Sequence, residues 1–401
     1  MSTLSVIIPA LNERDGIGAI IERVLAIRPS LQQAGIGDLE LIVVDDGSQD
    51  GTGEIAAAYP SVQVVRHSVN RGYGAALKTG FRHATGDLLA FLDADGTYPP
   101  EYFPRLCQAA LDGADLVIGS RMAGTESEMP LVRRIGNVLF AGLVSLVGNQ
   151  HVSDSASGMR VLRREALECL YPLPDGLNFT PIMSTRAIHE KLKMVEVPIP
   201  YRERVGRSKL KVLRDGTRYL QSITWTALSY NPVRILGGIS VLLGLVAVAI
   251  AILLVGARLG GVTTLGAWGV AGVFVLMLSA VASVSLFCLG AMFNYLVSLF
   301  YRRPVRQGLF GRPIFDPPLD RQFGWVGALS LGGGVVLGLV SFVLGLNGWA
   351  IERLWLYLLA AALAILVGMN LMISWLVMRI LEELSQRDVK IQDDLAAQGA
   401  E

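Results

Sequence analysis

The chain has 401 residues, a formal net charge of +1 at pH 7 and 52% hydrophobic residues. A chain of this length is long enough for two domains. The near-neutral charge lacks the basic footprint of a nucleic-acid-binding protein, so we expect no nucleic-acid partner. The three cysteines, Cys107, Cys169 and Cys288, are far apart and odd in number, which argues against a disulfide framework and a metal-binding motif.

Short apolar runs alternate with longer mixed segments over the first part of the chain. The runs that are typical of strands cover residues 4–9, 39–44, 62–66, 88–92, 116–119 and 194–197. Helix-like segments lie between them, for example at residues 17–26, 53–59, 75–84 and 101–111. This alternation predicts a mostly parallel sheet covered by helices. We therefore expect an α/β, Rossmann-like domain over residues 1–230.

A pair of acids follows the fourth of these runs. The apolar residues 88–92 lead directly into Asp93, Ala94 and Asp95. In open α/β sheets, ligands bind at the carboxyl ends of the strands. Two neighbouring carboxylates repel each other unless they share a cation, and Mg²⁺ and Mn²⁺ prefer oxygen ligands and commonly bridge carboxylates to a diphosphate. The acid pair is therefore a candidate metal site, and a solvated acidic turn is the alternative interpretation.

Polar or glycine-rich segments accompany three other strand ends. They cover residues 6–13, 41–48 and 70–80. The carboxylate of Asp45 in the second segment can accept hydrogen bonds from a base or a ribose. The glycines of the third leave room for a ligand to approach the backbone ahead of a helix N-terminus. A tight loop before an amphipathic helix is the alternative for the third segment.

These four segments, in this order, resemble the GT-A-fold glycosyltransferases of family 2 over about the first 230 residues. The resemblance implies a catalytic role for Asp93 and Asp95, which would hold a Mg²⁺ or Mn²⁺ ion on the diphosphate of a nucleotide sugar. It also implies that further residues bind the nucleotide sugar, namely Pro9, Ala10, Asn12, Glu13, Asp45, Gly72, Lys78 and Ala94.

Two segments of the same domain combine apolar residues with arginines at one end. The first, near residues 131–148, is too short to span a bilayer. In the second, residues 210–230, the aromatic residues Tyr219 and Trp225 follow the arginines. Arginines and aromatic rings suit the headgroup region of a membrane, so we expect two interfacial helices. A buried core helix is the alternative for the first.

A basic segment, residues 201–210, precedes the second of these helices. Arginine and lysine side chains bind phosphate well. The segment resembles the Gly-x-Ser-Lys segment of polyprenyl-phosphate glycosyltransferases of the dolichol-phosphate mannose synthase type. The resemblance implies that Arg204, Ser208 and Lys209 close over the donor and acceptor phosphates. A solvated basic run, or one that lies on lipid headgroups, is the alternative.

The same resemblance assigns the lipid phosphate to arginines earlier in the chain. Arg121 would act in catalysis and would hold the phosphate together with Arg133 or Arg134. The chain departs from these relatives in three places. Many of them have Leu-Gln where this chain has Gly96 and Thr97, so the glutamine that could contact the metal is absent. Residues 156–160 read Ala-Ser-Gly-Met-Arg instead of Thr-Ser-Gly-Phe-Arg, and residues 178–183 lack the acid that relatives often carry.

The second part of the chain, residues 231–401, carries four uncharged apolar runs. They cover about residues 235–256, 267–301, 325–349 and 354–378. Because about 20 apolar residues suffice to cross a bilayer, we expect an all-α membrane domain of four helices, followed by a charged tail. Four buried helices of a soluble domain are the alternative. Asn294 and Asn370 lie within these runs and are expected to hydrogen-bond neighbouring helices.

Arginines gather between the second and third runs, namely Arg302, Arg303, Arg306 and Arg312. The connections after the first and third runs carry few charges. Because cytoplasmic loops are enriched in arginine and lysine, we expect the arginine loop in the cytosol. An even number of spans then places the catalytic domain and the tail there too. We expect an integral, multi-pass protein of a bacterial or archaeal cell membrane.

Together these features predict an inverting, metal-dependent hexosyltransferase at the cytosolic membrane face. It would move mannose or glucose from GDP-mannose or UDP-glucose to a polyprenyl phosphate, such as dolichyl or undecaprenyl phosphate. Inversion is what the family resemblance implies. A phosphate monoester has its second pKa near ~6, so the nucleophile is already deprotonated and needs no general base. Asp154 could serve as a base, but we favour a structural or phosphate-organising role.

Two other functions are alternatives. A processive polysaccharide synthase usually carries a Gln-x-x-Arg-Trp motif, and the nearest match here, residues 221–225, lacks the arginine. A membrane scaffold or flippase subunit with a degenerate transferase fold is the non-enzymatic alternative, and the intact acid pair argues against it. The four spans could anchor the enzyme, form a homo-oligomer or assist flipping of the product.

Overall fold

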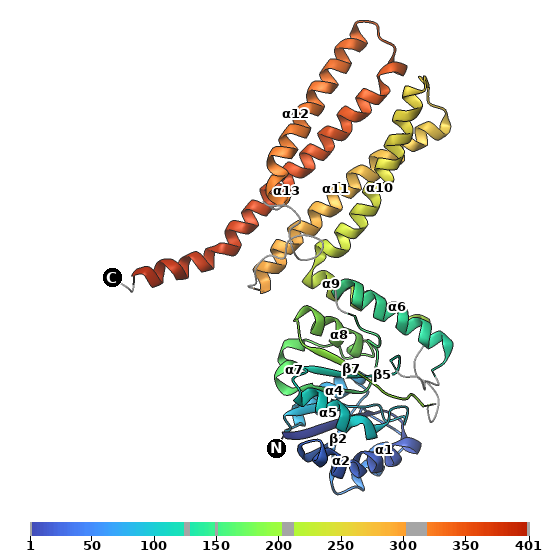
Figure 1. Cartoon of the computed structure of the whole chain (residues 1–401), viewed down its shortest axis with the longest axis vertical. Coiled ribbons are helices and arrows are strands. Elements are labelled where there is room, and N and C mark those ends of the chain that lie inside the picture. Colours follow the sequence, from blue (N-terminus) through green and yellow to red (C-terminus); the bar gives the residue numbers. More distant parts are fainter. Residues whose placement is uncertain (1, 124–128, 149–150, 203–211, 302–318, 399–401) are drawn as a thin grey trace. The chain divides into compact units, whose positions relative to one another are not determined.

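The computed structural model describes residues 2–123, 129–148, 151–202, 212–301 and 319–398. The chain divides into two compact units, Met1–Thr226 and Ala227–Glu401 (Figure 1). The first unit contains the sheet and the second consists of long helices, so the predicted order of an α/β domain followed by an all-α domain is confirmed. The division falls inside one helix, α9 (Val212–Tyr230).

Within its described residues, the first unit is built on one seven-stranded sheet, in the order β3-β2-β1-β4-β6-β5-β7. The strands are β1 (Ser2–Ala10), β2 (Ile36–Asp45), β3 (Val62–Arg66), β4 (Leu88–Phe91), β5 (Leu116–Ser120), β6 (Arg160–Arg163) and β7 (Met194–Pro198). Six of them match predicted strands, and most neighbouring pairs are parallel. The predicted set lacks β6, which runs antiparallel between β4 and β5.

Helices cover both faces of this sheet. The described helices of this unit are α1 (Arg14–Ala26), α2 (Arg28–Gln33), α3 (Thr52–Ala57), α4 (Tyr73–His83), the 3-10 turn η1 (Pro100–Tyr102), α5 (Phe103–Leu111), α6 (Leu131–Gly148), α7 (Arg164–Leu170), α8 (Phe179–His189) and the first part of α9. On β1, Val6 and Ile8 pack into the core that contains α1 and α5, whereas Ile7 packs into the core that contains α4 and α8. Because successive side chains of a strand point to opposite faces, one strand supplies both cores.

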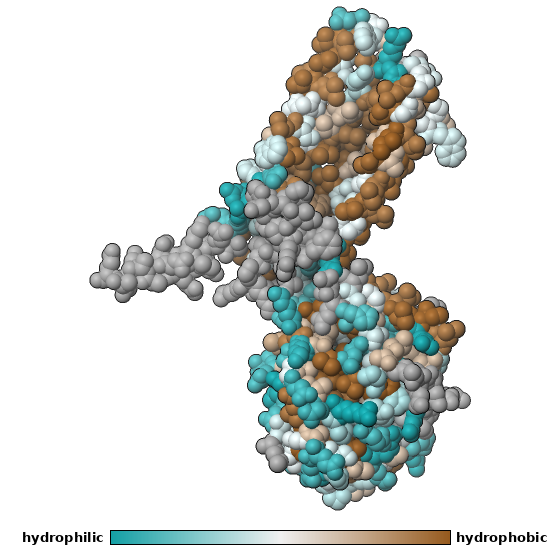
Figure 2. Space-filling view, viewed as in Figure 1, coloured by the Kyte–Doolittle hydropathy of each residue, from teal (hydrophilic) through white to brown (hydrophobic). Residues whose placement is uncertain are grey.

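Besides the end of α9, the described part of the second unit consists of four long helices: α10 (Pro232–Leu259), α11 (Ala267–Tyr301), α12 (Leu319–Leu346) and α13 (Ile351–Gln398). Each contains an apolar window long enough to cross a membrane, and at most 17% of any such window is buried within the protein. Figure 2 shows apolar side chains over these helices. Leu253, Phe274 and Leu339 are examples of large apolar residues that are exposed. So much exposed apolar surface is stable only in lipid, and the chain is a multi-pass membrane protein.

The helices of the second unit are joined by close packing and by polar contacts. α10 packs on α11, α12 packs on α13, and α11 also contacts α13. A Cβ on Gly368 of α13 would lie 2.5 Å from the Leu331 backbone nitrogen of α12, so glycine allows this close approach. Asn370 Nδ2 donates to Ser285 Oγ at 2.5 Å, and Asn294 Oδ1 accepts a backbone N–H of α10 at 3.4 Å. Both asparagines therefore bond neighbouring helices, as predicted.

Candidate active site

The carboxyl ends of β1, β2 and β4 lie side by side at one edge of the sheet, because the three strands are parallel neighbours. Ala10, the last residue of β1, stands opposite Asp45, the last residue of β2. Asp93 and Asp95 follow β4 closely. The fold therefore brings together the strand ends at which the sequence predicted ligand binding.

The loops after β1 and β2 are bound to each other. The Asn12 backbone nitrogen donates to Ser48 Oγ at 2.9 Å, and the Gln49 nitrogen donates to Asn12 Oδ1 at 2.9 Å. Asn12 has a φ of 49°, a conformation that asparagine adopts more readily than most residues. The predicted nucleotide-binding residues at this edge are Pro9, Ala10, Asn12, Glu13 and Asp45. Their contact with a nucleotide stays a prediction.

Asp46, the second acid after β2, turns into the protein. It is buried, and its carboxylate contacts His67 Nδ1 at 2.6 Å. It also accepts hydrogen bonds from the backbone nitrogens of Arg71 and Gly72, at 2.9 and 2.8 Å. Asp46 therefore ties the start of α4 to the end of β2. The sequence did not predict this role, and its one local signal was the position of Asp46 next to Asp45.

The glycine-containing loop at the start of α4 packs against the backbone at Asp175. A Cβ on Gly72 would lie 2.5 Å from the carbonyl oxygen of Asp175, and the Ala75 backbone nitrogen donates to that oxygen at 3.1 Å. Lys78 Nζ donates to the Leu173 carbonyl at 3.0 Å and pairs with the Asp175 carboxylate. Gly72 and Lys78 thus have partners within the chain, and their predicted contact with a nucleotide stays a prediction.

Each carboxylate of the acid pair accepts a hydrogen bond from a nearby hydroxyl. The Tyr73 hydroxyl donates to Asp93 Oδ1 at 2.8 Å, and the Thr97 hydroxyl donates to Asp95 Oδ1 at 2.6 Å. Burial, and then the negative charge of Asp93, raise the pKa of the Tyr73 phenol well above its usual value, so this hydroxyl stays protonated. Gly158 lies against Asp93, since a Cβ there would be 2.5 Å from Asp93 Oδ2.

The acid pair fits a hard divalent cation. In the described ranges, no three His, Cys, Asp or Glu side chains come close enough to form a metal cage by themselves. Two carboxylates that leave other positions to phosphate and water are an arrangement that Mg²⁺ uses with nucleotides. The missing Cβ of Gly158 leaves space for the Asp93 oxygens. The residues present therefore suit a Mg²⁺ or Mn²⁺ ion held by Asp93 and Asp95.

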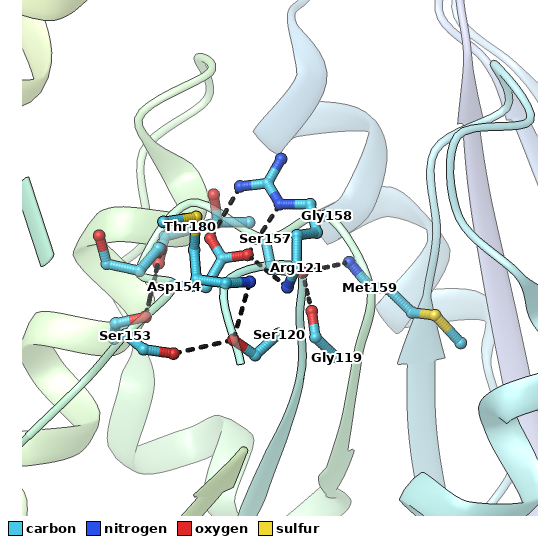
Figure 3. A network of polar contacts seen from close by, with 12 residues as sticks. Gly119, Ser120, Arg121, Ser153, Asp154, Ser157, Gly158, Met159 and Thr180 are labelled. Atoms are coloured by element: carbon cyan, nitrogen blue, oxygen red, sulfur yellow. Dashed lines mark hydrogen bonds and ion pairs between the residues drawn. The ribbon is translucent and has the colours of Figure 1, made fainter. Parts of the chain in front are cut away.

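Arg121, which follows β5, forms a bidentate ion pair with Asp154 (Figure 3). Its Nε and Nη2 donate to the two carboxylate oxygens at 2.7 Å each, and its backbone nitrogen donates to Oδ2 at 3.0 Å. Burial by itself would raise the pKa of Asp154, but the charge and hydrogen bonds of Arg121 outweigh burial and hold that pKa below its usual value. The fully buried Asp154 therefore fixes the direction of the guanidinium.

Two aromatic rings pack against the Arg121 guanidinium, and one of them, Tyr98, connects it to the acid pair. The Arg121 guanidinium lies 5.8 Å from the centre of the Tyr98 ring and 5.4 Å from that of Tyr201, within the range of cation–π attraction. The Tyr98 hydroxyl accepts the backbone N–H of Gly158 at 2.7 Å. Gly158 in turn lies against Asp93. A chain of direct contacts therefore runs from the guanidinium to the first acid.

Arg160 on β6 is a second buried cation near the site, and the sequence did not predict a role for it. Its Nη2 donates to the Ser155 carbonyl at 2.7 Å, and its Nε donates to the Ser157 carbonyl at 3.1 Å. Burial lowers the pKa of Arg160 to about 10, so the guanidinium remains charged at neutral pH. Arg160 thereby holds the turn that precedes Gly158 and positions it beside the acid pair.

The structure describes only some of the remaining residues that were predicted to bind phosphate. Arg134 is exposed on α6. Arg133 belongs to the same helix, but its side chain lies outside the described residues. Arg204, Ser208 and Lys209 also lie outside the described ranges. That these side chains bind phosphate together with Arg121 therefore stays a prediction.

Helix α6 has one exposed apolar face and one packed face. The exposed fractions are 71% for Leu131, 53% for Ile135, 54% for Val138 and 67% for Leu139. The packed face contacts α8 and α9, where the Phe140 ring stands edge-on to Tyr219 at 5.7 Å between centres. Both segments predicted to lie at a membrane interface are thus helical, and α6 exposes the side chains that such a position requires.

Comparison with known proteins identifies the family of this chain. Residues 5–171 match the family described as Glycosyl transferase family 2, and residues 232–392 match a domain of unknown function, DUF8752. The chain is 32% identical, over 280 residues, to an undecaprenyl-phosphate 4-deoxy-4-formamido-L-arabinose transferase of Edwardsiella ictaluri, a match that covers 68% of this chain and 81% of that protein. The chain belongs to glycosyl transferase family 2, and the predicted family is confirmed.

Other relatives match a shorter part of the chain. The low-salt glycan biosynthesis hexosyltransferase Agl6 of Haloferax volcanii is 36% identical over 232 residues, which are 57% of this chain and 54% of that protein. A dolichol-phosphate mannosyltransferase of Pyrococcus furiosus is 35% identical over 217 residues, 52% of this chain and 59% of that protein. The chain thus spans just over half the length of these two relatives.

Among solved structures, a glucosyl-3-phosphoglycerate synthase of Mycobacterium tuberculosis, in complex with Mn²⁺, UDP-glucose and phosphoglyceric acid, is 24% identical to this chain. The TM-score is 0.47, and the match covers 56% of this chain and 80% of that chain.

Proposed function

We propose that this protein transfers a hexose from a nucleotide diphosphate sugar to a polyprenyl phosphate, with inversion at the anomeric carbon. The observation that carries the proposal is the chain of contacts from the acid pair to Arg121 through Gly158 and Tyr98. It supports a cation site and a phosphate site next to each other at the strand ends. Relatives named for undecaprenyl phosphate and dolichol phosphate support a lipid acceptor.

In the proposed mechanism, Asp93 and Asp95 would hold a Mg²⁺ or Mn²⁺ ion at the donor site. When bound, the ion would supply neutralisation of the negative charge on the leaving nucleotide diphosphate. Arg121 and the arginines of α6 attract the acceptor phosphate. The acceptor is a phosphate monoester with a second pKa near ~6, so it arrives deprotonated and needs no general base. Asp154 then orients Arg121, a role that fits its complete burial.

The nucleotide is assigned to the edge formed by the loops after β1 and β2, where Asp45 would accept a hydrogen bond from the base or ribose. The further residues assigned to the donor are Pro9, Ala10, Asn12, Glu13, Gly72, Lys78, Ala94, Arg204 and Lys209. Ser208 is assigned to the lipid phosphate. GDP-mannose and UDP-glucose are the proposed donors, and the name of the P. furiosus relative supports mannose.

The catalytic unit is proposed to work at the cytosolic face of the membrane. Support comes from the arginine-rich connection between α11 and α12, which includes Arg302 and Arg312, because such loops stay in the cytosol. The exposed apolar face of α6 supports a position at headgroup depth, where the phosphate of a polyprenyl lipid lies.

The test uses the full-length protein in detergent with Mn²⁺ or Mg²⁺ and undecaprenyl or dolichyl phosphate. Labelled GDP-mannose and UDP-glucose are offered in turn, and Asp95→Ala is assayed alongside. We expect label in an organic-extractable, mild-acid-labile product with one donor, and loss of that product in the variant. Label in a water-soluble polymer would replace this function with polysaccharide synthesis. Absence of transfer with every nucleotide sugar offered would overturn the proposal.

A further inference from the structure

Two hydroxyl groups donate hydrogen bonds to the acid pair. One belongs to Tyr73, which precedes the pair in the sequence, and the other to Thr97, which follows it. We propose that Tyr73 and Thr97 are positioning residues, each of which fixes one carboxylate of the acid pair in the orientation that binds a divalent cation. This inference rests on the proposed function, which assigns that cation to Asp93 and Asp95.

Tyr73 is itself held in place at the start of α4. The nitrogen of the preceding Gly72 donates to the buried Asp46 at 2.8 Å, which fixes the backbone. The Tyr73 ring stands edge-on to Phe179 with 6.5 Å between centres, which restricts the ring. From this position the hydroxyl donates to Asp93 Oδ1 at 2.8 Å. The direction of this hydrogen bond is therefore determined by groups outside the acid pair.

Thr97 holds Asp95 with two hydrogen bonds. Its hydroxyl donates to Asp95 Oδ1 at 2.6 Å, and its backbone nitrogen donates to the same oxygen at 3.1 Å. Thr97 is 1% exposed, so water competes little for these contacts. Its carbonyl accepts the backbone N–H of Arg202 at 3.3 Å, which ties the turn to the segment after β7. Many of the polyprenyl-phosphate glycosyltransferases that this chain resembles have glutamine at the position of Thr97. Here a threonine hydroxyl takes the place of the glutamine amide.

The physical effect of both contacts is preorganisation. Two close carboxylates repel each other and turn apart unless neighbouring groups restrain them. A restrained carboxylate loses less orientational freedom when the cation binds, so the cation binds more tightly. Removal of a group that hydrogen-bonds a ligating side chain typically weakens metal binding by about 10–100-fold. On the Asp93 side, Gly158 adds steric confinement, since a Cβ there would be 2.5 Å from Oδ2.

The test measures Mn²⁺ binding directly, by the electron paramagnetic resonance signal of free Mn²⁺. Full-length protein in detergent is titrated with Mn²⁺ alone, and with Mn²⁺ plus UDP or GDP. Tyr73→Phe and Thr97→Val remove the two hydroxyls. Thr97→Ser is a control that keeps a hydroxyl at position 97. Tyr59→Phe is the matched control for loss of a phenol hydroxyl, because the Tyr59 hydroxyl donates to Glu22 on the surface. Circular dichroism and thermal unfolding confirm that each variant is folded.

We expect Tyr73→Phe and Thr97→Val to raise the Mn²⁺ dissociation constant by about 10-fold or more, while Thr97→Ser and Tyr59→Phe match the wild type. The Mn²⁺ concentration for half-maximal transfer should rise by the same factor, and the rate at saturating Mn²⁺ should recover. Wild-type affinity in both hydroxyl variants would overturn the inference. If the wild type and Asp95→Ala bind Mn²⁺ equally, or neither binds it, the metal assignment of the proposed function is itself wrong.

Discussion

The ion pair between Arg121 and Asp154 predicts how stability depends on pH. Because the pKa of Asp154 is held below its usual value in the folded protein, the pair contributes fully above the ordinary aspartate pKa of about 3.9. That contribution is lost as the pH falls through the lowered pKa. Asp154→Asn removes one charge of a buried pair, a change that costs about 3–5 kcal/mol. We therefore expect the free energy of unfolding of Asp154→Asn to lie below that of the wild type. This stability deficit should be constant between about pH 8 and about pH 5 and should shrink only at lower pH.

Thermal unfolding of the wild type and Asp154→Asn in the same detergent measures this deficit across the pH range. Asp112→Asn is the matched control, because Asp112 is exposed and accepts a hydrogen bond from Gln108 on the surface. A deficit that already shrinks between about pH 8 and about pH 5 would contradict the prediction, because the Asp154 carboxyl would then titrate above its ordinary pKa.

Gly158 predicts a second effect at the residue scale. A Cβ at this position would lie 2.5 Å from Asp93 Oδ2 and 2.8 Å from Oδ1, so in Gly158→Ala the carboxylate must turn away. We expect sugar transfer to fall by about 10–100-fold, the range seen when groups around a metal ligand are changed. Gly142→Ala is the control, because a Cβ there meets no described atom within 4 Å. Transfer assays with undiminished rates in folded Gly158→Ala would refute this account.

The place of Asp93 and Asp95 at a strand end could be predicted from the sequence, whereas the contacts that hold the side chains of the candidate site could not. A short apolar run that ends in Asp93 and Asp95 marks both a strand and the edge at which ligands bind. Tyr73 shows no such local signal. For Asp154 the sequence suggested a structural or phosphate-organising role, but it did not indicate the partner. Asp154 meets Arg121 across 33 positions of sequence, and Tyr73 meets Asp93 across 20. Such contacts between distant residues depend on the tertiary fold, and a local sequence pattern does not predict them.

At the scale of elements, the parallel strands could be predicted and β6 could not. The parallel strands are apolar on both faces and have turn residues around them, which is a clear pattern. β6 has only four residues and carries arginine at both ends, so it shows no apolar run. Its position comes from pairing with β4 on one side and β5 on the other. The inserted strand places Arg160 inside the protein, next to Phe91 of β4.

The exposed apolar face of α6 leads to a prediction about the lipid acceptor. Burial of an aliphatic side chain contributes about 1.5–3 kcal/mol, so loss of part of this contact in Val138→Gln/Leu139→Gln should weaken lipid binding about tenfold. We expect KM for polyprenyl phosphate to rise accordingly, with KM for the donor unchanged. Steady-state kinetics in mixed lipid and detergent measures both values. Leu111→Gln, at the exposed end of α5, is the control.

A proportional rise of both KM values in the α6 variant would contradict this interpretation, because it would indicate general damage to the catalytic unit. An unchanged KM for the lipid, in a folded variant, would show that α6 does not contact the membrane.

At the scale of the whole molecule, the two parts of the chain differ in composition, and this difference made the membrane domain predictable. Runs of about 20 uncharged apolar residues indicate spans directly. The ends of the helices were less predictable. α12 begins at Leu319, before the apolar run, and α13 continues to Gln398, well beyond it. Charged residues such as Asp320 and Arg321 extend α12 beyond its apolar run, so a search for apolar runs does not include them.

The sidedness of the membrane domain is the last prediction. If the arginine-rich connection between α11 and α12 is cytosolic, the connections at Thr263 and Asn347, both exposed, lie on the opposite side. In intact spheroplasts, Thr263→Cys and Asn347→Cys, each in a Cys169→Ser background, should react with a membrane-impermeant maleimide. The native Cys169, which is exposed on the catalytic unit, should react only after permeabilisation, while the buried Cys107 and Cys288 stay unlabelled. Labelling of Cys169 in intact spheroplasts, with both introduced cysteines protected, would reverse the orientation and separate the catalytic unit from cytosolic nucleotide sugars.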